Sequence, residues 1–361
     1  MKINFFTHTA KCGGAEFSLI DLIRVAECEK KKVTLLDSGD LVAKLKSFDA
    51  EVNEFHRGNG YFEFIRKLFY LKTSFKGYDI VYSNSNRAYL WALLVKLLFF
   101  KRFKLIWHLR DAMDGNHFGI IRYPVCLSSR LTGVFVVFNS EYTRSAFRSS
   151  FGKDGLVIYN GFDMKNFSTN EVSNQSSPYK IAMISRISPW KGQKEVIKAV
   201  ANLDFNVEVL VCGAPLFGED EYYNEICREV EILNLKDKVK FLGNVSNVPK
   251  FLAETDINLV IHASTLPEPF GRCVVEAMLT GIPVMASNLG GVPEIANKDS
   301  FAYLFDPLEP NDLERGLKFC VSSQQSLMAK AKQADKECRN KFSYENLRES
   351  INVFLRNVYE N

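Results

Sequence analysis

The chain has 361 residues, with 46 Lys and Arg against 42 Asp and Glu, and a formal net charge of +4. Its 47% apolar and 24% charged residues exclude a disordered or fibrous protein, and its length predicts two globular domains. The charge is uneven, because residues 1–168 hold 25 basic and 16 acidic residues and the remainder holds 21 and 26. Either the two halves bind different partners, or the difference in net charge arose by chance on two solvent-exposed surfaces.

Membrane, secreted and metal-binding classes find little support in the sequence. The longest apolar stretch, residues 89–100, is interrupted by Lys96 and is shorter than the roughly 20 residues of a membrane span. The N-terminus lacks a secretory pattern, the eight cysteines form no Cys-x-x-Cys pair, and the five histidines lack metal-ligand spacing. We therefore expect a cytoplasmic protein with reduced thiols.

Short β-rich runs alternate with amphipathic stretches in the first half of the chain. A glycine turn and a helix, residues 13–27, follow the first of these runs. The other runs read as further strands of one parallel sheet. The expected strands are 2–8, 31–37, 78–85, 103–109, 133–140 and 155–161.

A polar Ser/Asn-rich segment, residues 169–178, is the predicted linker, after which the same alternation begins again. The sequence thus predicts an α/β protein of two doubly wound, Rossmann-like domains, 1–168 and 179–343, with a cleft between them. A last helix, 344–361, is expected to cross back to the first domain. The second set of expected strands is 179–185, 206–213, 238–243, 257–263, 283–287 and 302–307, and the expected helices begin near 194, 221 and 271. Ligands of such sheets bind beyond the carboxyl ends of the strands.

The strongest motif is LPEPFGRCVVEAMLTG, residues 266–281. Glu268 precedes a turn, and Gly271 opens a helix whose first N–H groups can bind an anion. Glu276 lies just over one turn into that helix, where it can accept hydrogen bonds from a ribose diol. Followed by GIPVMASNLGGVPEI, this spacing favours a binding site over two solvated acids.

A second motif, ISRISPWKG, places Arg186 at the end of a strand and Lys191 just before a helix. Two cations at the carboxyl end of a strand suit a diphosphate, because Arg donates forked hydrogen bonds and Lys supplies a point charge. An ordinary exposed pair of cations is the alternative.

Two weaker signals lie in the first half. Gly13 and Gly14 follow the first strand, where glycines allow close approach to a phosphate or a sugar, although a plain strand–helix turn fits equally well. His108 ends another strand in WHLRD, either facing the cleft or as a buried, hydrogen-bonded histidine.

Taken together, these motifs resemble the retaining glycosyltransferases of family 4, which have the GT-B fold. The resemblance runs from residue 2 to about 354 and is strongest over 180–306, where SRISPWKG, PEPFGRCVVEAMLTGIPV and GGVPEI stand in the expected order. GGAE, WHLRD and YNGFD match in the first half.

The resemblance implies a role for each matching residue in binding a nucleotide-diphosphate-sugar donor. Arg186 and Lys191 would neutralise the diphosphate, Glu276 would bind the ribose and Glu268 the donor sugar. The backbone N–H groups of Phe270 and Gly271 would also contact the donor. From the other domain, His108 would contact the donor sugar, and Gly13 and Gly14 the β-phosphate or the acceptor. Base contacts are expected from the loop 243–248.

The resemblance also implies a metal-independent hexosyltransferase that retains the anomeric configuration and needs no cofactor. Its acceptor would be a glycan, and a lipid-linked one in surface polysaccharide or lipopolysaccharide assembly is expected. A nucleotide-sugar epimerase of similar fold and a non-catalytic GT-B scaffold are the alternatives. Nucleic-acid binding is not expected, because no recognition motif appears and the second half is acidic.

Two basic, aromatic stretches of the first half, 62–76 and 90–104, concern the acceptor side. Such stretches can lie on the anionic inner face of the cytoplasmic membrane. Core helices with a solvated lysine edge are the alternative.

Overall fold

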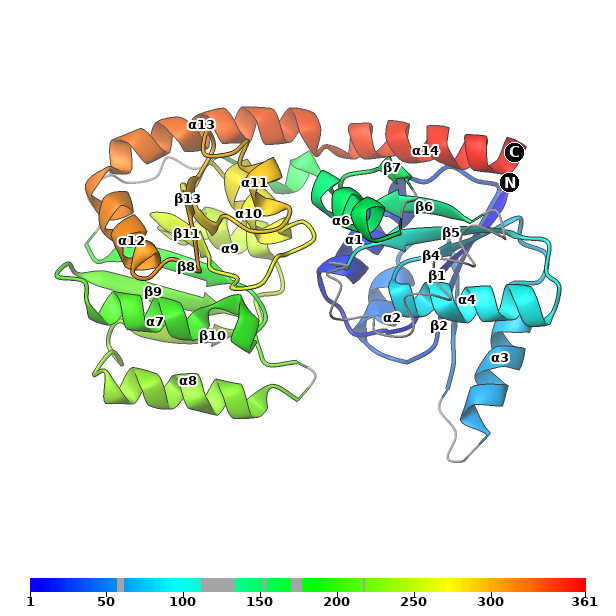
Figure 1. The fold of residues 1–361 in the computed structure, drawn as a ribbon, viewed down its shortest axis with the longest axis horizontal. Helices are drawn as coiled ribbons and strands as arrows, with labels where there is room; N and C mark the ends of the chain where they lie inside the picture. The colour runs from blue at the N-terminus through cyan, green and yellow to red at the C-terminus, as the bar shows by residue number, and fades with distance from the viewer. Residues whose placement is uncertain (57–61, 112–133, 152–153, 170–176, 217) are drawn as a thin grey trace. The chain divides into compact units, whose positions relative to one another are not determined.

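The computed structural model describes residues 1–56, 62–111, 134–151, 154–169, 177–216 and 218–361. The chain folds into two compact units (Figure 1). The first unit comprises Met1–Phe162 and Tyr344–Asn361, and the second comprises Asp163–Ser343. Each is a parallel β-sheet with helices on both faces, which confirms the predicted α/β fold of two Rossmann-like units. None of the helices in the described part of the chain has the length and apolar character needed to span a bilayer.

In the first unit, the described residues form a seven-stranded sheet with the order β3-β2-β1-β4-β5-β6-β7, and all its pairs are parallel. The central strands are apolar and fully buried, as expected for a sheet covered on both faces. The strands are β1 (Lys2–Thr7), β2 (Lys30–Leu35), β3 (Glu51–Glu54), β4 (Ile80–Ser83), β5 (Lys104–Leu109), β6 (Phe135–Phe138) and β7 (Leu156–Val157).

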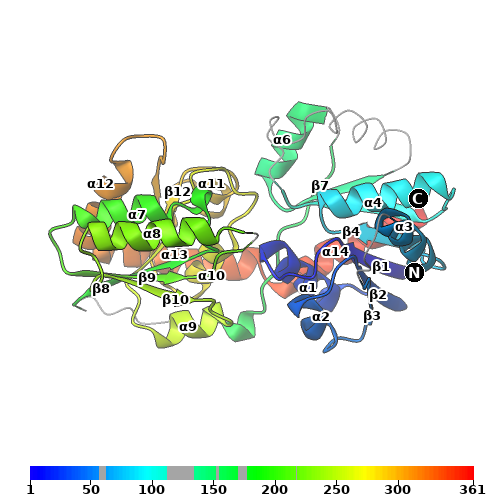
Figure 2. The same ribbon diagram turned by 90° about the horizontal axis from the view of Figure 1, so that it is seen from below.

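Two hydrophobic clusters hold the helices of this unit against opposite faces of the sheet. Side chains of α1, α2 and α14 pack on β1 and β2, and side chains of α3, α4 and α6 pack on β4, β5 and β6. Figure 2 shows the same unit from below. The helices are α1 (Gly14–Val25), α2 (Asp40–Leu45), α3 (Glu63–Ser74), α4 (Asn86–Leu98), α6 (Glu141–Phe151) and α14 (Tyr344–Glu360).

Helix α14 belongs to the first unit, although it is last in sequence. Its apolar residues Leu347, Ile351, Leu355 and Val358 are three or four apart, so that they form one buried stripe. Asn352 fixes its position, because its side chain donates to the carbonyl of Val25 and accepts from the N–H of Glu27.

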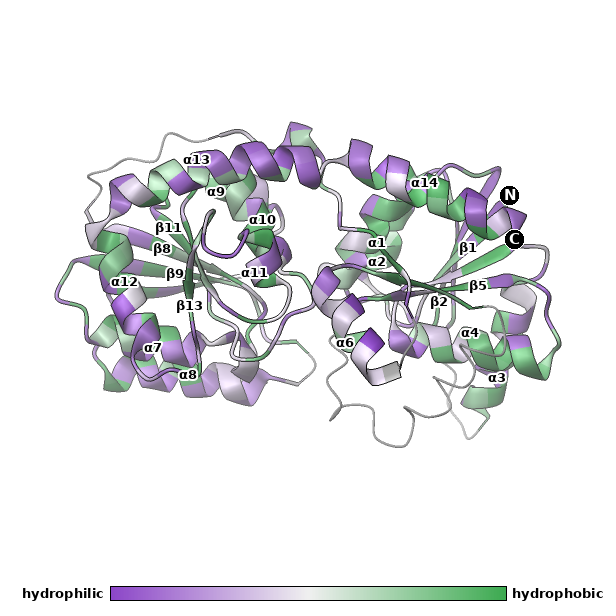
Figure 3. Cartoon of the chain, turned by 45° about the horizontal axis from the view of Figure 1, so that its top comes forward, coloured by the Kyte–Doolittle hydropathy of each residue, from purple (hydrophilic) through white to green (hydrophobic). Residues whose placement is uncertain are grey.

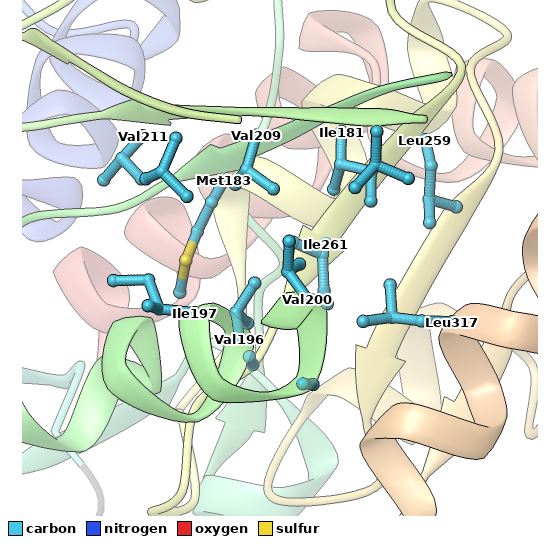
Figure 4. Close-up of a cluster of buried hydrophobic side chains, with 14 of the residues drawn as sticks. Ile181, Met183, Val196, Ile197, Val200, Val209, Val211, Leu259, Ile261 and Leu317 are labelled. Carbon is cyan, nitrogen blue, oxygen red and sulfur yellow. The ribbon is translucent and has the colours of Figure 1, made fainter. Parts of the chain in front are cut away.

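In the second unit, the described residues form a six-stranded parallel sheet with the order β10-β9-β8-β11-β12-β13. Its core contains Ile181, Val209 and Ile261 of the sheet, packed against Val196 and Val200 of α7 (Figure 4). Helices α7, α8 and α12 contribute to that core, and α10 packs against α13. The strands are β8 (Tyr179–Ile184), β9 (Val207–Cys212), β10 (Val239–Gly243), β11 (Leu259–His262), β12 (Val284–Ser287) and β13 (Tyr303–Phe305). The helices are α7 (Gln193–Ala201), α8 (Asp220–Ile232), α9 (Val248–Glu254), α10 (Arg272–Leu279), α11 (Val292–Ile295), α12 (Asp312–Ser322) and α13 (Gln324–Lys341).

The boundary between the units differs from the sequence prediction. Residues 163–168, which the sequence analysis gives to the first domain, belong to the second unit and include a short 3₁₀ helix, η2 (Met164–Asn166). Most of the predicted linker, residues 170–176, lies outside the described residues.

Candidate functional site

The strand order of the second sheet reverses between β8 and β11, which are neighbours although far apart in sequence. In open α/β sheets, ligands bind at such a switch point, beyond the carboxyl ends of the strands. Arg186 and Lys191 follow β8, and Glu268 follows β11. The topology therefore brings the two strongest sequence motifs to one edge of one sheet.

The Glu268 carboxylate is the centre of a buried hydrogen-bond network. Its Oε1 accepts from Lys191 Nζ and from the hydroxyl of Ser264. His262 Nε2 lies 2.8 Å from the same oxygen, and its Nδ1 lies 3.3 Å from the hydroxyl of Ser287. Among the described residues, no side chain or backbone N–H donates to Oε2.

The surroundings of Glu268 keep it ionised. Burial alone would raise the pKa of this carboxyl, but the charges of Lys191 and His262, with their hydrogen bonds, hold its pKa well below its usual range. Glu268 is 9% exposed, and the side chain of Lys191 is 13% exposed. The site thus holds a buried, charge-assisted pair before any ligand binds.

Two glycines, Gly290 and Gly291, pack directly against the backbone of the loop that carries Glu268. Gly290 has φ +66°, and a Cβ there would lie 2.2 Å from the carbonyl oxygen of Glu268. Gly291 donates its N–H to the same carbonyl over 2.8 Å. A Cβ at Gly291 would lie 2.6 Å from the carbonyl oxygen of Pro269, so both glycines allow the GGVPEI segment to pack directly on the backbone of this loop.

In the loop after β8, the cationic groups of Arg186 and Lys191 both lie close to the indole ring of Trp190. Lys191 Nζ lies 4.1 Å from the centroid of Trp190, and the guanidinium of Arg186 lies 5.3 Å from it. The Trp190 carbonyl accepts the N–H of Thr265 over 2.8 Å, which ties this loop to the one after β11. Glu219, in the loop after β9, lies 4.0 Å from Arg186 and accepts from the hydroxyl of Ser188.

Helix α10 begins where the sequence predicts, with Gly271 as its N-cap at φ +101°. The ring of Phe270 is buried and packs edge-on against Phe342, with centroids 5.6 Å apart. Glu276 lies one turn into α10, and its Oε1 is 3.6 Å from Arg272. The acid predicted to bind ribose therefore has a neighbouring cation on its own helix.

The remaining predicted site residues lie in the first unit. Gly13 caps α1, and its N–H donates to Glu16 Oε2 over 3.2 Å, with Gly14 as the first residue of the helix. His108 is buried in β5, and its Nδ1 lies 2.6 Å from the hydroxyl of Tyr82. Burial, and then the charge of Arg110, holds the pKa of His108 well below its usual range. Their contacts to a donor stay predictions.

Sequence reasoning missed three members of the Glu268 network: His262, Ser264 and Ser287. The spacing of the histidines excludes a metal site but says nothing about a hydrogen-bonding role for His262. The available signal was the sequence His-Ala-Ser at the end of a strand directly before the PEPFG loop. Among the described residues, no three His, Cys, Asp or Glu side chains are grouped so that they could hold a metal ion.

Residues 164–338 match the family model described as "Glycosyl transferases group 1". The matched residues cover most of the second unit, which comprises Asp163–Ser343. The match spans β8 to β13, so that Arg186, Lys191, Glu268 and Glu276 all lie within it.

Solved structures are similar to this protein over nearly the whole chain. The structure of Alr3699/HepE from Anabaena in complex with UDP-glucose is 29% identical, with a TM-score of 0.89, and the alignment covers 99% of this chain and all of that one. A glycosyltransferase from Rickettsia africae, 20% identical with a TM-score of 0.83 over all of this chain and 99% of that one, shares the fold. The fold is GT-B.

Curated relatives match over shorter stretches. An N-acetyl-alpha-D-glucosaminyl L-malate synthase of Bacillus anthracis is 28% identical over 42% of this chain and 40% of its own length. An uncharacterized glycosyltransferase of Methanocaldococcus jannaschii is 26% identical over 70% of this chain and 64% of its own length. The chain thus spans between about two fifths and two thirds of these relatives.

Proposed function

We propose that this protein is a glycosyltransferase that moves a sugar from a nucleotide-diphosphate-sugar donor to a sugar acceptor. The observation that carries the proposal is the meeting of Arg186, Lys191 and Glu268 at the switch point of a group 1 domain. Because the similar Anabaena protein has been crystallised with UDP-glucose, UDP-glucose is the first donor to test.

In this proposal, each site residue binds a different part of the nucleotide-sugar donor. Arg186 and Lys191 bind the diphosphate, helped by the N-terminus of α10 at Phe270 and Gly271. Glu276 binds the ribose. The free Oε2 of Glu268 accepts from a hydroxyl of the donor sugar, while its Oε1 stays bonded to Lys191 and His262.

The loop 243–248, which joins β10 to α9, contacts the base. Gly13, Gly14 and His108 are assigned to the donor sugar, its β-phosphate or the acceptor, as in the resemblance to family 4.

The reaction retains the anomeric configuration, as in family 4 glycosyltransferases. The bond between the anomeric carbon and the β-phosphate oxygen breaks, and a bond to the acceptor oxygen forms on the same face. The leaving phosphate takes the proton of the acceptor hydroxyl, so that no protein base is needed. Arg186 and Lys191 offset the negative charge that grows on the diphosphate, and such electrostatic stabilisation of the transition state is in general a large contribution to catalysis. No cofactor or metal ion is assigned to this hexosyl transfer.

The proposed acceptor is a lipid-linked glycan in surface polysaccharide or lipopolysaccharide assembly, on the cytoplasmic side of the membrane. The basic composition of residues 1–168 supports an anionic or membrane-bound acceptor. A nucleotide-sugar epimerase and a non-catalytic scaffold are not favoured, since the family model and the named relatives are glycosyltransferases and synthases.

A two-stage experiment tests this function. A thermal-shift panel of nucleotide sugars identifies the donor, because a ligand that binds only the folded protein raises the melting temperature. Incubation with that donor, with and without glycan acceptors, then separates transfer from epimerisation. Transfer with the anomeric configuration retained by NMR supports the proposal. Conversion of the donor sugar without acceptor would indicate the epimerase, and an inverted product would contradict the mechanism.

A further inference from the structure

Helix α3 of the first unit exposes a row of large apolar side chains. Phe62, Ile65 and Phe69 are 71%, 47% and 54% exposed. They are three and four residues apart, so that they lie on one face of the helix. The opposite face already supplies Leu68 and Leu71 to the core. The exposed row is therefore additional to the apolar surface that folding requires.

The end of α4 continues this surface. Phe100 is 90% exposed, and Leu97 and Leu98 just before it are about half exposed. Contacts between rings join the two helices: Phe69 lies 5.8 Å from Phe99, and Phe64 lies 4.9 Å from Trp91. Green, hydrophobic segments run along both helices in Figure 3. We call this surface the α3–α4 face. It comprises the exposed side chains of Phe62, Phe64, Ile65, Phe69, Leu97, Leu98 and Phe100, together with Trp91 and Phe99, which are partly buried against the core.

Cations accompany the α3–α4 face, and acids are nearly absent from it. Residues 62–76 and 86–104 hold nine Lys and Arg and one acid, Glu63, which pairs with Lys67. Lys72 Nζ lies 4.5 Å from the centroid of Phe99, at the junction of the two helices. Lys101 and Arg102 directly follow Phe100. The two segments that supply these apolar side chains therefore also carry a strong excess of positive charge, although Lys96 donates to the carbonyl of Phe103 and Lys104 to that of Tyr359.

We propose that the α3–α4 face docks on the surface of an anionic lipid bilayer. Phenylalanine, leucine and tryptophan side chains enter the boundary between headgroups and acyl chains, and flanking Lys and Arg bind anionic headgroups. A second copy of the chain is a poorer occupant, because a symmetric contact would set the same cations against each other. The inference goes beyond the proposed reaction and does not depend on it.

Sedimentation with vesicles tests the docking on the full chain. Vesicles of phosphatidylcholine with about 30% phosphatidylglycerol are compared with phosphatidylcholine alone, at low and at high ionic strength. We expect binding to the anionic vesicles at low ionic strength, weaker binding at high ionic strength and little binding to the neutral vesicles. Absence of binding at low ionic strength, or equal binding to both vesicles, would overturn the proposal.

Variants separate the apolar and the charged parts of the face. Phe69→Ser and Leu98→Ser should each weaken the partition into anionic vesicles about tenfold. Lys72→Gln and Arg102→Gln should each weaken it about fivefold. The matched control is Ile232→Ser, at an apolar residue of the second unit that is 73% exposed, and it should bind as the wild type does. Equal losses in the control and in the face variants would contradict the assignment.

Tryptophan fluorescence locates the contact independently. Brominated lipids should quench Trp91, and Trp91→Phe should remove most of that quenching, while Trp107 is fully buried. Oligomeric state is measured in the same samples. A dimer that Phe69→Ser dissociates, without vesicle binding by either protein, would assign the face to a second copy instead.

Discussion

The ammonium of Lys191 donates a hydrogen bond to Oε1 of Glu268, although the two residues are 77 positions apart. Neighbouring parallel strands, β8 and β11, make the contact possible, because the loops that follow them lie at the same edge of the sheet. In the proposed reaction, Lys191 stands between this carboxylate and the donor diphosphate. The carboxylate fixes the cation before the donor binds, and such preorganisation is what makes a charged group effective in the transition state.

Removal of either cation that we propose binds the diphosphate should slow the reaction. We expect Lys191→Ala and Arg186→Ala each to lower kcat/KM by roughly 10²–10³-fold, the scale for a lost electrostatic stabiliser. Steady-state kinetics with the identified donor measures the effect. Lys198→Ala is the control, since Lys198 lies on the exposed side of α7, 3.9 Å from Glu229, and its loss should leave the rate unchanged. Near-wild-type rates in both site variants would remove the diphosphate assignment.

Loss of the ribose contact should show mainly in donor binding. Glu276→Ala should raise the KM for the donor more than it lowers kcat, because a ribose contact is made equally in the ground state and the transition state. Glu231→Ala, which removes an exposed acid of α8 that pairs with Lys236, serves as the control for a lost acid of the same unit. A fall in kcat at unchanged KM would instead place Glu276 at the reacting atoms.

Glu268 should also make folding stability depend on pH. The folded state holds the pKa of Glu268 well below 4.5, its ordinary value. Its ionisation therefore stabilises the fold above about pH 4.5, and that contribution is lost as the pH falls through the folded-state pKa. Glu268→Gln should melt below the wild type at pH 7, and the difference should shrink as the pH falls below 4.5. Thermal melts between pH 3 and pH 7 measure it, and a difference that does not change with pH would contradict the coupling.

Sequence patterns predicted most of the fold because its strands are short, apolar and buried on both faces. The edge strand β3 has the polar sequence EVNE and escaped prediction, since an edge strand needs no apolar run. The stretch 90–104 was read as one segment, whereas α4 ends at Leu98 and β5 begins at Lys104.

The site shows a similar division between what the sequence indicates and what only the fold determines. Local motifs mark Arg186, Lys191, Glu268 and Glu276 as candidate site residues, so the sequence alone is enough to predict them. The bond between Lys191 and Glu268, and the link from Ser287 through His262 to Glu268, depend on which strands are neighbours. Strand order is set by the packing of the whole unit, so no local pattern reveals these contacts.

Because Gly290 packs closely against the backbone of Glu268, adding one methyl group at Gly290 should lower both stability and activity. Gly290→Ala forces a Cβ to within 2.2 Å of the Glu268 carbonyl at φ +66°, so the loop must shift and displace Glu268. Gly77→Ala is the control, because its φ of +82° is equally unfavourable for alanine but no atom lies within 4 Å of the added Cβ. The control should lose about 2–4 °C in melting temperature. Gly290→Ala should lower the melting temperature more than the control does, and it should also lower activity. Equal falls in melting temperature in the two variants would contradict the close contact between Gly290 and Glu268.

Glu16 supplies the opposite pH dependence in the first unit. Burial raises the pKa of this carboxyl from 4.5 to about 7, against the opposing effect of the hydrogen bond from the Gly13 N–H. Because the folded pKa is raised, stability falls as the pH rises from 4.5 to about 7, and the penalty stays constant above that. Glu16→Gln removes the charge and should therefore abolish this part of the pH dependence.

At pH 8 the Glu16→Gln variant should be more stable by up to about 3 kcal/mol, and at pH 4 it should match the wild type. Chemical denaturation at both pH values measures the difference, and NMR of the Glu16 carboxyl carbon gives its pKa directly. Glu27→Gln, which changes an exposed acid just beyond α1, is the matched control. It should leave the free energy of unfolding unchanged at both pH 4 and pH 8. An NMR titration midpoint near 4.5 would remove the reason for the predicted stabilisation.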